Sequence, residues 1–334
     1  MDSFYFIENI KLLNKERIKD FLMLRGKNQE ELILTARDLR NKSKFQNKAE
    51  LRSVIELSNI CSQSCRYCSM GKNGNDIYFL SKDEILNRMK ILANLGRRTF
   101  LLQSGESHNR HFIDDISFCC EEILKLYPDI KIILCLGNLS KEEYKQLKDS
   151  GASRYILKFE TANGSHHKYC RPSDSIENRI KCIENLIEIG FQTGSGNIVG
   201  LPGQTLDNLY EDLVLINKLD LAMVSATKFI SNEYSEFKNY SDGDIDLTLN
   251  FLAILRILKP DCLIPSTSSL ETNSSNGQLR GLLAGCNTVT IHDGTPKELE
   301  KKYTIYSEKR YMPEEEFCIN IIKQAGMEPV KYLI

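Results

Sequence analysis

Residues 53–68 read SVIELSNICSQSCRYC and join an apolar run to three closely spaced cysteines. The run at 53–57 is short and rich in aliphatic residues, as in a buried strand. Directly after it, Cys61, Cys65 and Cys68 follow in the spacing C-x3-C-x2-C. Parallel α/β folds build their sites where strands end. The stretch therefore predicts a strand that leads straight into a functional loop.

Seven further apolar runs alternate with helix-patterned stretches. The runs lie at 99–103, 131–136, 155–159, 192–199, 223–229, 263–265 and 288–291. Helical patterns occupy 82–95, 113–126, 141–149, 176–189, 206–218, 247–258, 277–284 and 314–324. Such alternation implies βαβ units and a parallel sheet. Because eight strands suit a closed barrel better than an open sheet, we predict an α/β fold, a full (β/α)8 TIM-type barrel at 49–334 after a helical extension at 1–48.

Composition excludes several classes of protein. The 334 residues are 41% apolar and carry 44 basic and 45 acidic side chains, so a polymeric nucleic acid partner is not indicated. No apolar run is long enough for a membrane span, and the charged N-terminus has no signal-peptide core. We expect a cytoplasmic protein without a membrane partner. Its eleven cysteines are an odd number and are expected to be thiols or metal ligands.

The cysteine triplet suits a [4Fe–4S] cluster. Three thiolates bind three irons of a cubane and leave the fourth iron open, whereas four-cysteine ferredoxin sites close it. Zinc is the alternative, but a structural zinc usually needs a fourth protein ligand at a matched spacing. His108 and His111 make a poor second pair. The spacing therefore favours the cluster.

With Tyr67 before the third cysteine, the triplet resembles the signature of the radical SAM superfamily. That resemblance implies two cofactors, a [4Fe–4S] cluster and S-adenosylmethionine (SAM). It implies that SAM binds the open iron and that one electron releases a 5′-deoxyadenosyl radical. The electron would come from a flavodoxin- or ferredoxin-type reductant, and the radical would attack a small-molecule substrate. Tyr67 would lie against the SAM adenine or merely pack over the cluster loop.

Other strand ends carry matching elements. Gln103, Ser104, Gly105 and Glu106 resemble the "GGE" element that contacts the SAM amino group; alone they would be read as a polar turn. The resemblance also implies SAM contacts from a second group of residues, namely Glu160 (ribose), Thr161, Arg179 (carboxylate) and Ile198 (adenine). Arg179 could instead be a surface residue paired with a helix glutamate. The glycine-rich stretch around Ile198 lacks the lysine of a phosphate-binding loop.

Together these elements resemble the biotin synthase-like subgroup, and within it the HydE type. QSGE, FETAN, RP, SIENR and GLPGQT match in order across 50–334. The substrate side departs from the HydE pattern. Lys158 replaces an arginine, 227–234 replaces a Pro-Phe-Ile-Pro-His-type loop, and His292-Asp293 replaces an Asn-Trp-type pair. The residues expected to bind SAM match the HydE pattern, whereas those expected to bind the substrate differ from it. We therefore expect a substrate other than that of HydE.

The candidate substrate-binding residues are Lys158, Lys228, Phe229, Glu271, His292 and Asp293. Asp293, Glu271 and Lys228 could instead be solvated loop charges. The Asp293 carboxylate could accept from the N–H edge of a guanine-type base. We therefore expect a lyase, a queuine lyase that cleaves a C–N bond of queuine in base salvage. The alternatives are a HydE-type [FeFe]-hydrogenase maturase, a methylornithine synthase-like mutase and, from another class, a cluster carrier, which would not need Glu106, Glu160 and Arg179.

Overall fold

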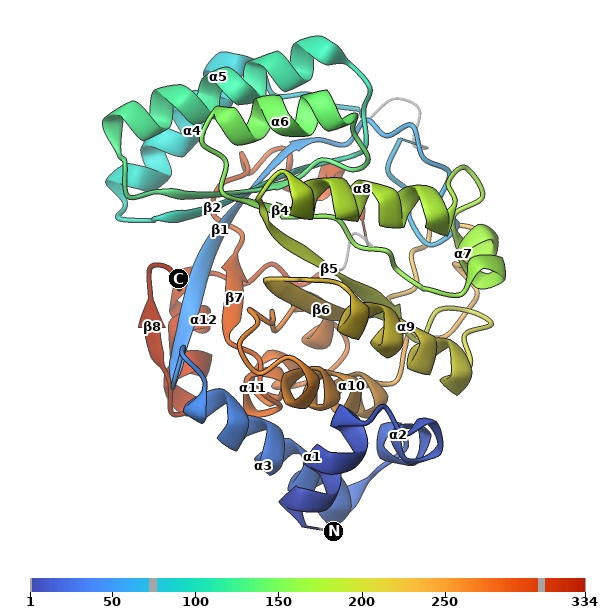
Figure 1. Ribbon diagram of the computed structural model, residues 1–334. Coiled ribbons are helices and arrows are strands. Elements are labelled where there is room, and N and C mark those ends of the chain that lie inside the picture. Colours follow the sequence, from blue (N-terminus) through green and yellow to red (C-terminus); the bar gives the residue numbers. More distant parts are fainter. Residues whose placement is uncertain (1, 72–76, 306–309, 334) are drawn as a thin grey trace.

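A curled parallel sheet forms the centre of the computed structural model, which describes residues 2–71, 77–305 and 310–333 (Figure 1). Seven strands pair side by side in the order β6-β5-β4-β3-β2-β1-β7, and β8 pairs with β1 off this path. All pairs are parallel. The strands are β1 (Lys48–Ser58), β2 (Thr99–Ser104), β3 (Lys131–Cys135), β4 (Arg154–Ile156), β5 (Gln192–Val199), β6 (Met223–Lys228), β7 (Thr288–Ile291) and β8 (Glu328–Val330).

Helices return the chain between strands and cover the outer face of the sheet (Figure 1). They are α4 (Lys82–Asn94), α5 (Arg110–Leu126), α6 (Lys141–Asp149), α7 (Gly164–Cys170), α8 (Ile176–Glu188), α9 (Leu206–Lys218), α10 (Ile245–Leu258), α11 (Gly277–Leu283), α12 (Glu315–Gln324) and the 3-10 turns η1 (Ser268–Leu270) and η2 (Glu300–Lys302). Ser81, Ser140 and Thr205 begin α4, α6 and α9 with reciprocal capping boxes. Such caps satisfy helix N–H groups that would otherwise lack partners.

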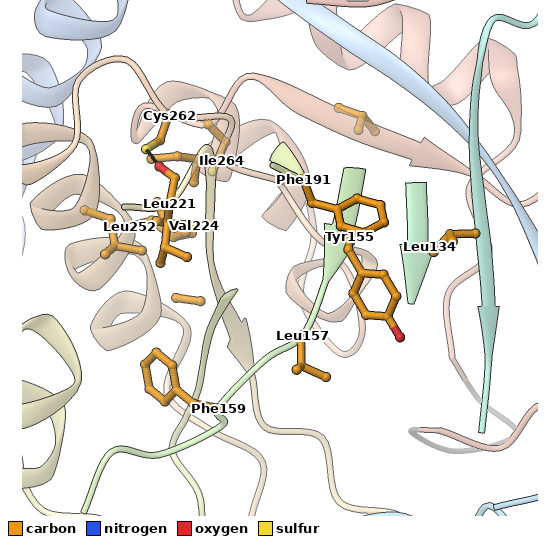
Figure 2. Packing of buried hydrophobic residues seen from close by; sticks show 14 of the residues in the cluster. Leu134, Tyr155, Leu157, Phe159, Phe191, Leu221, Val224, Leu252, Cys262 and Ile264 are labelled. Carbon is orange, nitrogen blue, oxygen red and sulfur yellow. Dashed lines mark hydrogen bonds between the residues drawn. The ribbon is translucent and has the colours of Figure 1, made fainter. Parts of the chain in front are cut away.

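The core lies between the sheet and these helices. Tyr155 of β4 packs edge-on against Phe191, with the ring centroids 5.7 Å apart (Figure 2). Elsewhere in this core the Cys262 thiol donates to the Leu221 carbonyl at 3.0 Å (Figure 2). Burial raises the pKa of the Cys120 and Cys262 thiols. These cysteines therefore serve packing.

The expected full barrel of eight regular strands is corrected by the structure. Residues 263–265 do not form a strand, although isolated parallel bridges join Leu263 to Met223 and Pro265 to Thr288. Pro265 has no N–H to donate to a ladder, which limits this segment to single bridges. The described residues thus form a curled seven-strand sheet with this short segment between its edges, and the run at 288–291 is β7.

Three helices precede β1: α1 (Ser3–Lys11), α2 (Lys15–Leu22) and α3 (Gly26–Lys42). They pack beneath α10 (Figure 1). Asn250 of α10 donates to the carbonyls of Leu22 and Leu24 at 2.9 Å each. The division into 1–48 and 49–334 stays a prediction. In the described part of the chain, no helix is long and apolar enough to cross a membrane.

Candidate active site

A cavity of about 250 Å³ opens inside the curl of the sheet. Nine residues that the sequence singled out line it: Tyr67, Gln103, Lys158, Glu160, Arg179, Ile198, Lys228, Phe229 and His292. Most belong to the carboxyl ends of β2, β4, β5, β6 and β7 or to the loops that follow. Parallel strands bring these ends together, which is why positions far apart in the sequence meet here.

The cysteine loop lies against the end of β2. A side chain at Gly105 would place its Cβ atom 2.2 Å from the Ile60 carbonyl oxygen and 2.8 Å from the Cys61 Cβ atom. Only glycine allows this approach. The Ser62 N–H donates to the Glu106 carbonyl at 2.8 Å. The role of Gly105 is thus to admit the loop that carries the cysteines.

Each of the three thiols accepts an N–H donor. The donors are the Glu106 amide to Cys61 Sγ at 3.4 Å, the Met70 amide to Cys68 Sγ at 3.4 Å and Arg171 Nη1 to Cys65 Sγ at 3.1 Å. Such donors suit the anionic thiolates of an iron–sulfur cluster. Among the described side chains, no three His, Cys, Asp or Glu converge on a single ion. Thiolates that bind different irons of a cubane need not converge, so the donor set fits a [4Fe–4S] cluster.

Glu106 and Arg179 are bound to each other beneath the cavity. The Glu106 carboxylate, 5% exposed, accepts from Gln63 Nε2 at 2.6 Å, the Asn138 amide at 2.9 Å and Arg179 Nη1 at 3.3 Å. Arg179 also donates from Nε to the Lys158 carbonyl at 2.9 Å. Arg179 therefore lines the cavity, and the alternative of a surface arginine is wrong.

Glu160 is held in an unusual backbone conformation. Its φ of +67° lies in the left-handed region, which non-glycine residues rarely adopt. Lys158 Nζ lies 2.9 Å from Glu160 Oε2 and 3.1 Å from Thr227 Oγ1. Backbone strain of this kind concentrates at functional sites. The lysine that replaces the arginine of the family pattern thus touches a predicted SAM ligand and the β6 side of the cavity.

An apolar wall faces these charges. Ile198 and Phe229 belong to one buried cluster, against which Tyr67 packs. The Tyr67 hydroxyl accepts from Arg171 Nη1 at 3.1 Å. An aromatic ring beside an aliphatic side chain offers a flat apolar surface, as an adenine needs.

Two further predicted residues enter the cavity from β6 and β7. Lys228 donates from Nζ to the Thr272 carbonyl at 2.7 Å, and burial lowers the pKa of its ammonium group. His292 lies beside Arg310, and burial together with that guanidinium lowers the pKa of the imidazole to about 3. The histidine is therefore neutral near pH 7.

Several predicted residues lie elsewhere. Asp293 accepts from Arg97 Nε at 2.8 Å and does not line the cavity, because adjacent residues at a strand end point to opposite sides. Glu271 accepts from the amides of Asn276 and Gln278 at 3.0 Å each and so orders the start of α11. The base-edge role expected for Asp293 and the substrate role of Glu271 are not supported by these positions.

Four predicted SAM-binding residues, Ser104, Gly105, Glu106 and Thr161, are also outside the cavity lining. The Thr161 hydroxyl is fully buried and lies 3.0 Å from His166 Nδ1. The Ser104 hydroxyl donates to the Gly105 carbonyl at 2.7 Å. Both side chains are engaged by their own loops, so any contact with SAM would come from the backbone.

Sequence reasoning missed a buried ion pair beside the cavity. Arg310 donates through both Nη atoms to the Glu56 carboxylate, with Nη2 2.7 Å from Oε2. Gln103 Nε2 donates to the same carboxylate at 3.3 Å. Burial raises the pKa of Glu56 although Arg310 opposes this shift. Glu56 could have been noticed as a charged residue inside the apolar run 53–57. Nothing in the sequence around Arg310 indicated that it pairs with Glu56.

Comparison with known proteins agrees with this geometry. The model of the radical SAM superfamily matches residues 55–216. The [FeFe] hydrogenase maturase subunit HydE of Thermotoga maritima is 34% identical over 297 residues, which cover 88% of this chain and 84% of that protein. The chain belongs to the radical SAM superfamily. Its cofactors are accordingly a [4Fe–4S] cluster and SAM, and it is an enzyme.

The subgroup is that of HydE and biotin synthase. Biotin synthase of Thermotoga petrophila is 26% identical over 82% of this chain and 91% of its own length. The crystal structure of methylornithine synthase superposes with a TM-score of 0.82 at 21% identity, covering 97% of both chains. That structural likeness bears on the fold of this radical SAM enzyme, not on its substrate.

Proposed function

We propose that Cys61, Cys65 and Cys68 hold the cluster of this radical SAM enzyme and that its radical abstracts hydrogen from a small molecule in the cavity. With both cofactors bound, the site would supply a 5′-deoxyadenosyl radical, formed from SAM by one electron from the cluster. The observation that carries the proposal is three thiols with N–H donors on a loop whose Tyr67 lines the cavity together with Arg179. We also propose that a flavodoxin- or ferredoxin-type reductant supplies the electron and that the enzyme is cytoplasmic.

The chain's own residues have separate tasks in this scheme. Arg179 would bind the SAM carboxylate, since a guanidinium fork suits that group. Glu160 would accept from the ribose hydroxyls, and Tyr67 with Ile198 would enclose the adenine. The buried walls exclude water, which protects a radical from side reactions. Lys228 and His292 face the remaining space, where the substrate would lie.

For the substrate, a HydE-type role in [FeFe]-hydrogenase maturation has the better support. It rests on 34% identity over 88% of the chain. A methylornithine synthase-like mutase has a related curated counterpart at 26% identity. We rank it behind the maturase role for that reason.

A queuine lyase is a further candidate. The observation in its favour is that residues that depart from the HydE pattern line the cavity. They are Lys158, Thr227, Lys228 and His292. Asp293, which suggested a guanine-type base, faces Arg97 instead. The case for queuine therefore depends on the altered cavity wall and not on a base-reading carboxylate.

The cluster assignment is tested by replacing one ligand. Anaerobically reconstituted protein should form 5′-deoxyadenosine from SAM and a reductant, and Cys65→Ala should not. Cys119→Ala removes a buried thiol far along the chain and should retain formation. Continued 5′-deoxyadenosine production by Cys65→Ala at wild-type rate would refute the assignment.

The substrate is tested in two parallel assays. In the first, the chain replaces HydE during maturation of an [FeFe] hydrogenase, and hydrogen evolution is measured. In the second, the enzyme is incubated with SAM, reductant and queuine, and the 7-deazaguanine product is sought by mass spectrometry. Hydrogenase activation without product supports the maturase role. Product without activation assigns the lyase role and overturns our preference.

A further inference from the structure

A short segment after α7 holds the cysteine loop in place. In this clamp segment, residues 170–174, the Cys170 carbonyl accepts from the Arg66 N–H at 2.9 Å. The Ser173 hydroxyl accepts from the Ser64 N–H at 3.0 Å and donates to Gln63 Oε1 at 2.7 Å. The segment includes the RP element of the sequence, to which the proposed function assigns no task.

Arg171 is the one cation of the clamp segment, and it reaches the cysteines directly. Its guanidinium is buried, and Nη1 donates both to Cys65 Sγ and to the Tyr67 hydroxyl at 3.1 Å each. Nη2 donates to Asp174 Oδ2 at the longer distance of 3.4 Å. The shorter contacts of this charge are therefore with the thiol and the neighbouring tyrosine.

Asp174 does not require Arg171 as a partner. Its carboxylate also accepts from Asn138 Nδ2 at 3.0 Å, Asn178 Nδ2 at 3.0 Å and the Ser175 amide at 2.9 Å. A buried carboxylate with three other donors is already satisfied. The hydrogen-bonding capacity of Asp174 thus does not by itself explain why a guanidinium is buried against Cys65.

We propose that Arg171 is a positioning residue that raises the reduction potential of the cluster through its hydrogen bond to Cys65 Sγ. Reduction adds one electron, taken from the flavodoxin- or ferredoxin-type reductant, and so adds one negative charge. A buried cation that donates to a ligand sulfur stabilises the reduced form more than the oxidised form. The inference depends on the proposed role of Cys65 as a cluster ligand.

The test measures midpoint potentials by anaerobic spectroelectrochemical titration of the full-length reconstituted protein. In Arg171→Met the potential should become more negative. The ratio of reduced to oxidised cluster at a fixed potential should fall about tenfold, which is about 59 mV for a one-electron couple. Arg171→Lys keeps the charge and should recover part of the shift. A wild-type potential in Arg171→Met with full iron content would overturn the proposal.

Variants of two neighbouring residues distinguish an effect of the Arg171 charge from a loss of support for the cysteine loop. Asp174→Asn removes the opposing charge and should move the potential in the positive direction. Ser173→Ala loosens the clamp segment without changing charge and should leave the potential unchanged. If Arg171→Met binds less iron, Asp174→Asn decides: a positive shift supports the proposal, and no shift or a negative one overturns it. Full iron retention in Cys65→Ala would instead defeat the cluster assignment.

Discussion

The direction of single side chains decides which residues serve the site. His292 and Asp293 are adjacent, yet one lines the cavity and the other pairs with Arg97 outside it. Glu106 illustrates a second effect, since its carboxylate is committed to Arg179 and its backbone to the cysteine loop. At this scale, a residue's contribution depends on its partners as much as on its type.

Arg179→Met should weaken SAM binding about 10- to 100-fold. The change removes a charged donor to the SAM carboxylate and leaves the buried Glu106 carboxylate without it, a loss of about 1.5–3 kcal/mol. Equilibrium dialysis with labelled SAM on the reconstituted protein measures the effect. Asp293→Asn, outside the cavity, is the matched control and should bind SAM normally. Unchanged affinity in Arg179→Met would contradict the role.

His292→Leu should lower kcat/KM for the true substrate about tenfold while SAM affinity stays near the wild-type value. The neutral imidazole lines the substrate side, and losing one buried hydrogen bond costs about 1–3 kcal/mol. Product formation is compared with that of Asp293→Asn, using whichever candidate substrate the wild type converts. An equal loss of kcat/KM in both variants would contradict the substrate-side role of His292.

Among the elements, β5 and β6 approach so closely that one glycine is essential. A Cβ atom at Gly196 would lie 1.9 Å from the Ser225 carbonyl oxygen. These two strands pair Ile198 with Thr227 and so place Ile198, Thr227 and Lys228 along one wall of the cavity. Their close approach therefore fixes the position of this part of the cavity wall.

Gly196→Ala should destabilise the fold by about 3 kcal/mol or more, because a backbone must shift to admit the methyl group. Gly190→Ala is the matched control in the turn just before the same strand, where nothing lies within 4 Å but φ is +88°. In this control the alanine must adopt a left-handed backbone conformation, which should lower the free energy of unfolding by only about 1–2 kcal/mol. Urea unfolding of the two variants compares them, and an equal loss in both would refute the close-approach argument.

Strand ends and helix starts could be predicted from the sequence because they are local. The alternation of apolar runs located β1 to β7, and the cysteine spacing located the cluster loop. Residues 263–265 were apolar enough to suggest a strand, but ladder pairing depends on neighbours and on Pro265. The pairing of Glu56 with Arg310 joins positions 254 residues apart, for which no local pattern exists.

At the scale of the whole molecule, the C-terminal segment closes the amino end of the sheet. Glu50 of β1 binds Arg52 at 2.7 Å and Arg154 at 2.8 Å, and it also accepts from the Leu333 N–H at 2.7 Å. Arg52 lines the cavity from this side. Buried charges are stable only when each is paired. The chain end thus completes a network that reaches the cavity from its closed side.

The stability of the whole molecule should decline as pH falls below about 6.5, because His167, like His292, is buried as the neutral form. Its side chain is fully buried, and burial lowers its pKa to about 4. The unfolded chain takes up a proton near pH 6.5, so between there and pH 4 acid favours unfolding by up to about 1.4 kcal/mol per pH unit. His167→Leu should flatten this dependence, measured as urea midpoints of samples with equal iron content. His111→Gln, on an exposed part of α5, controls for surface charge, and a His167→Leu profile as steep as the wild type would disprove the assignment.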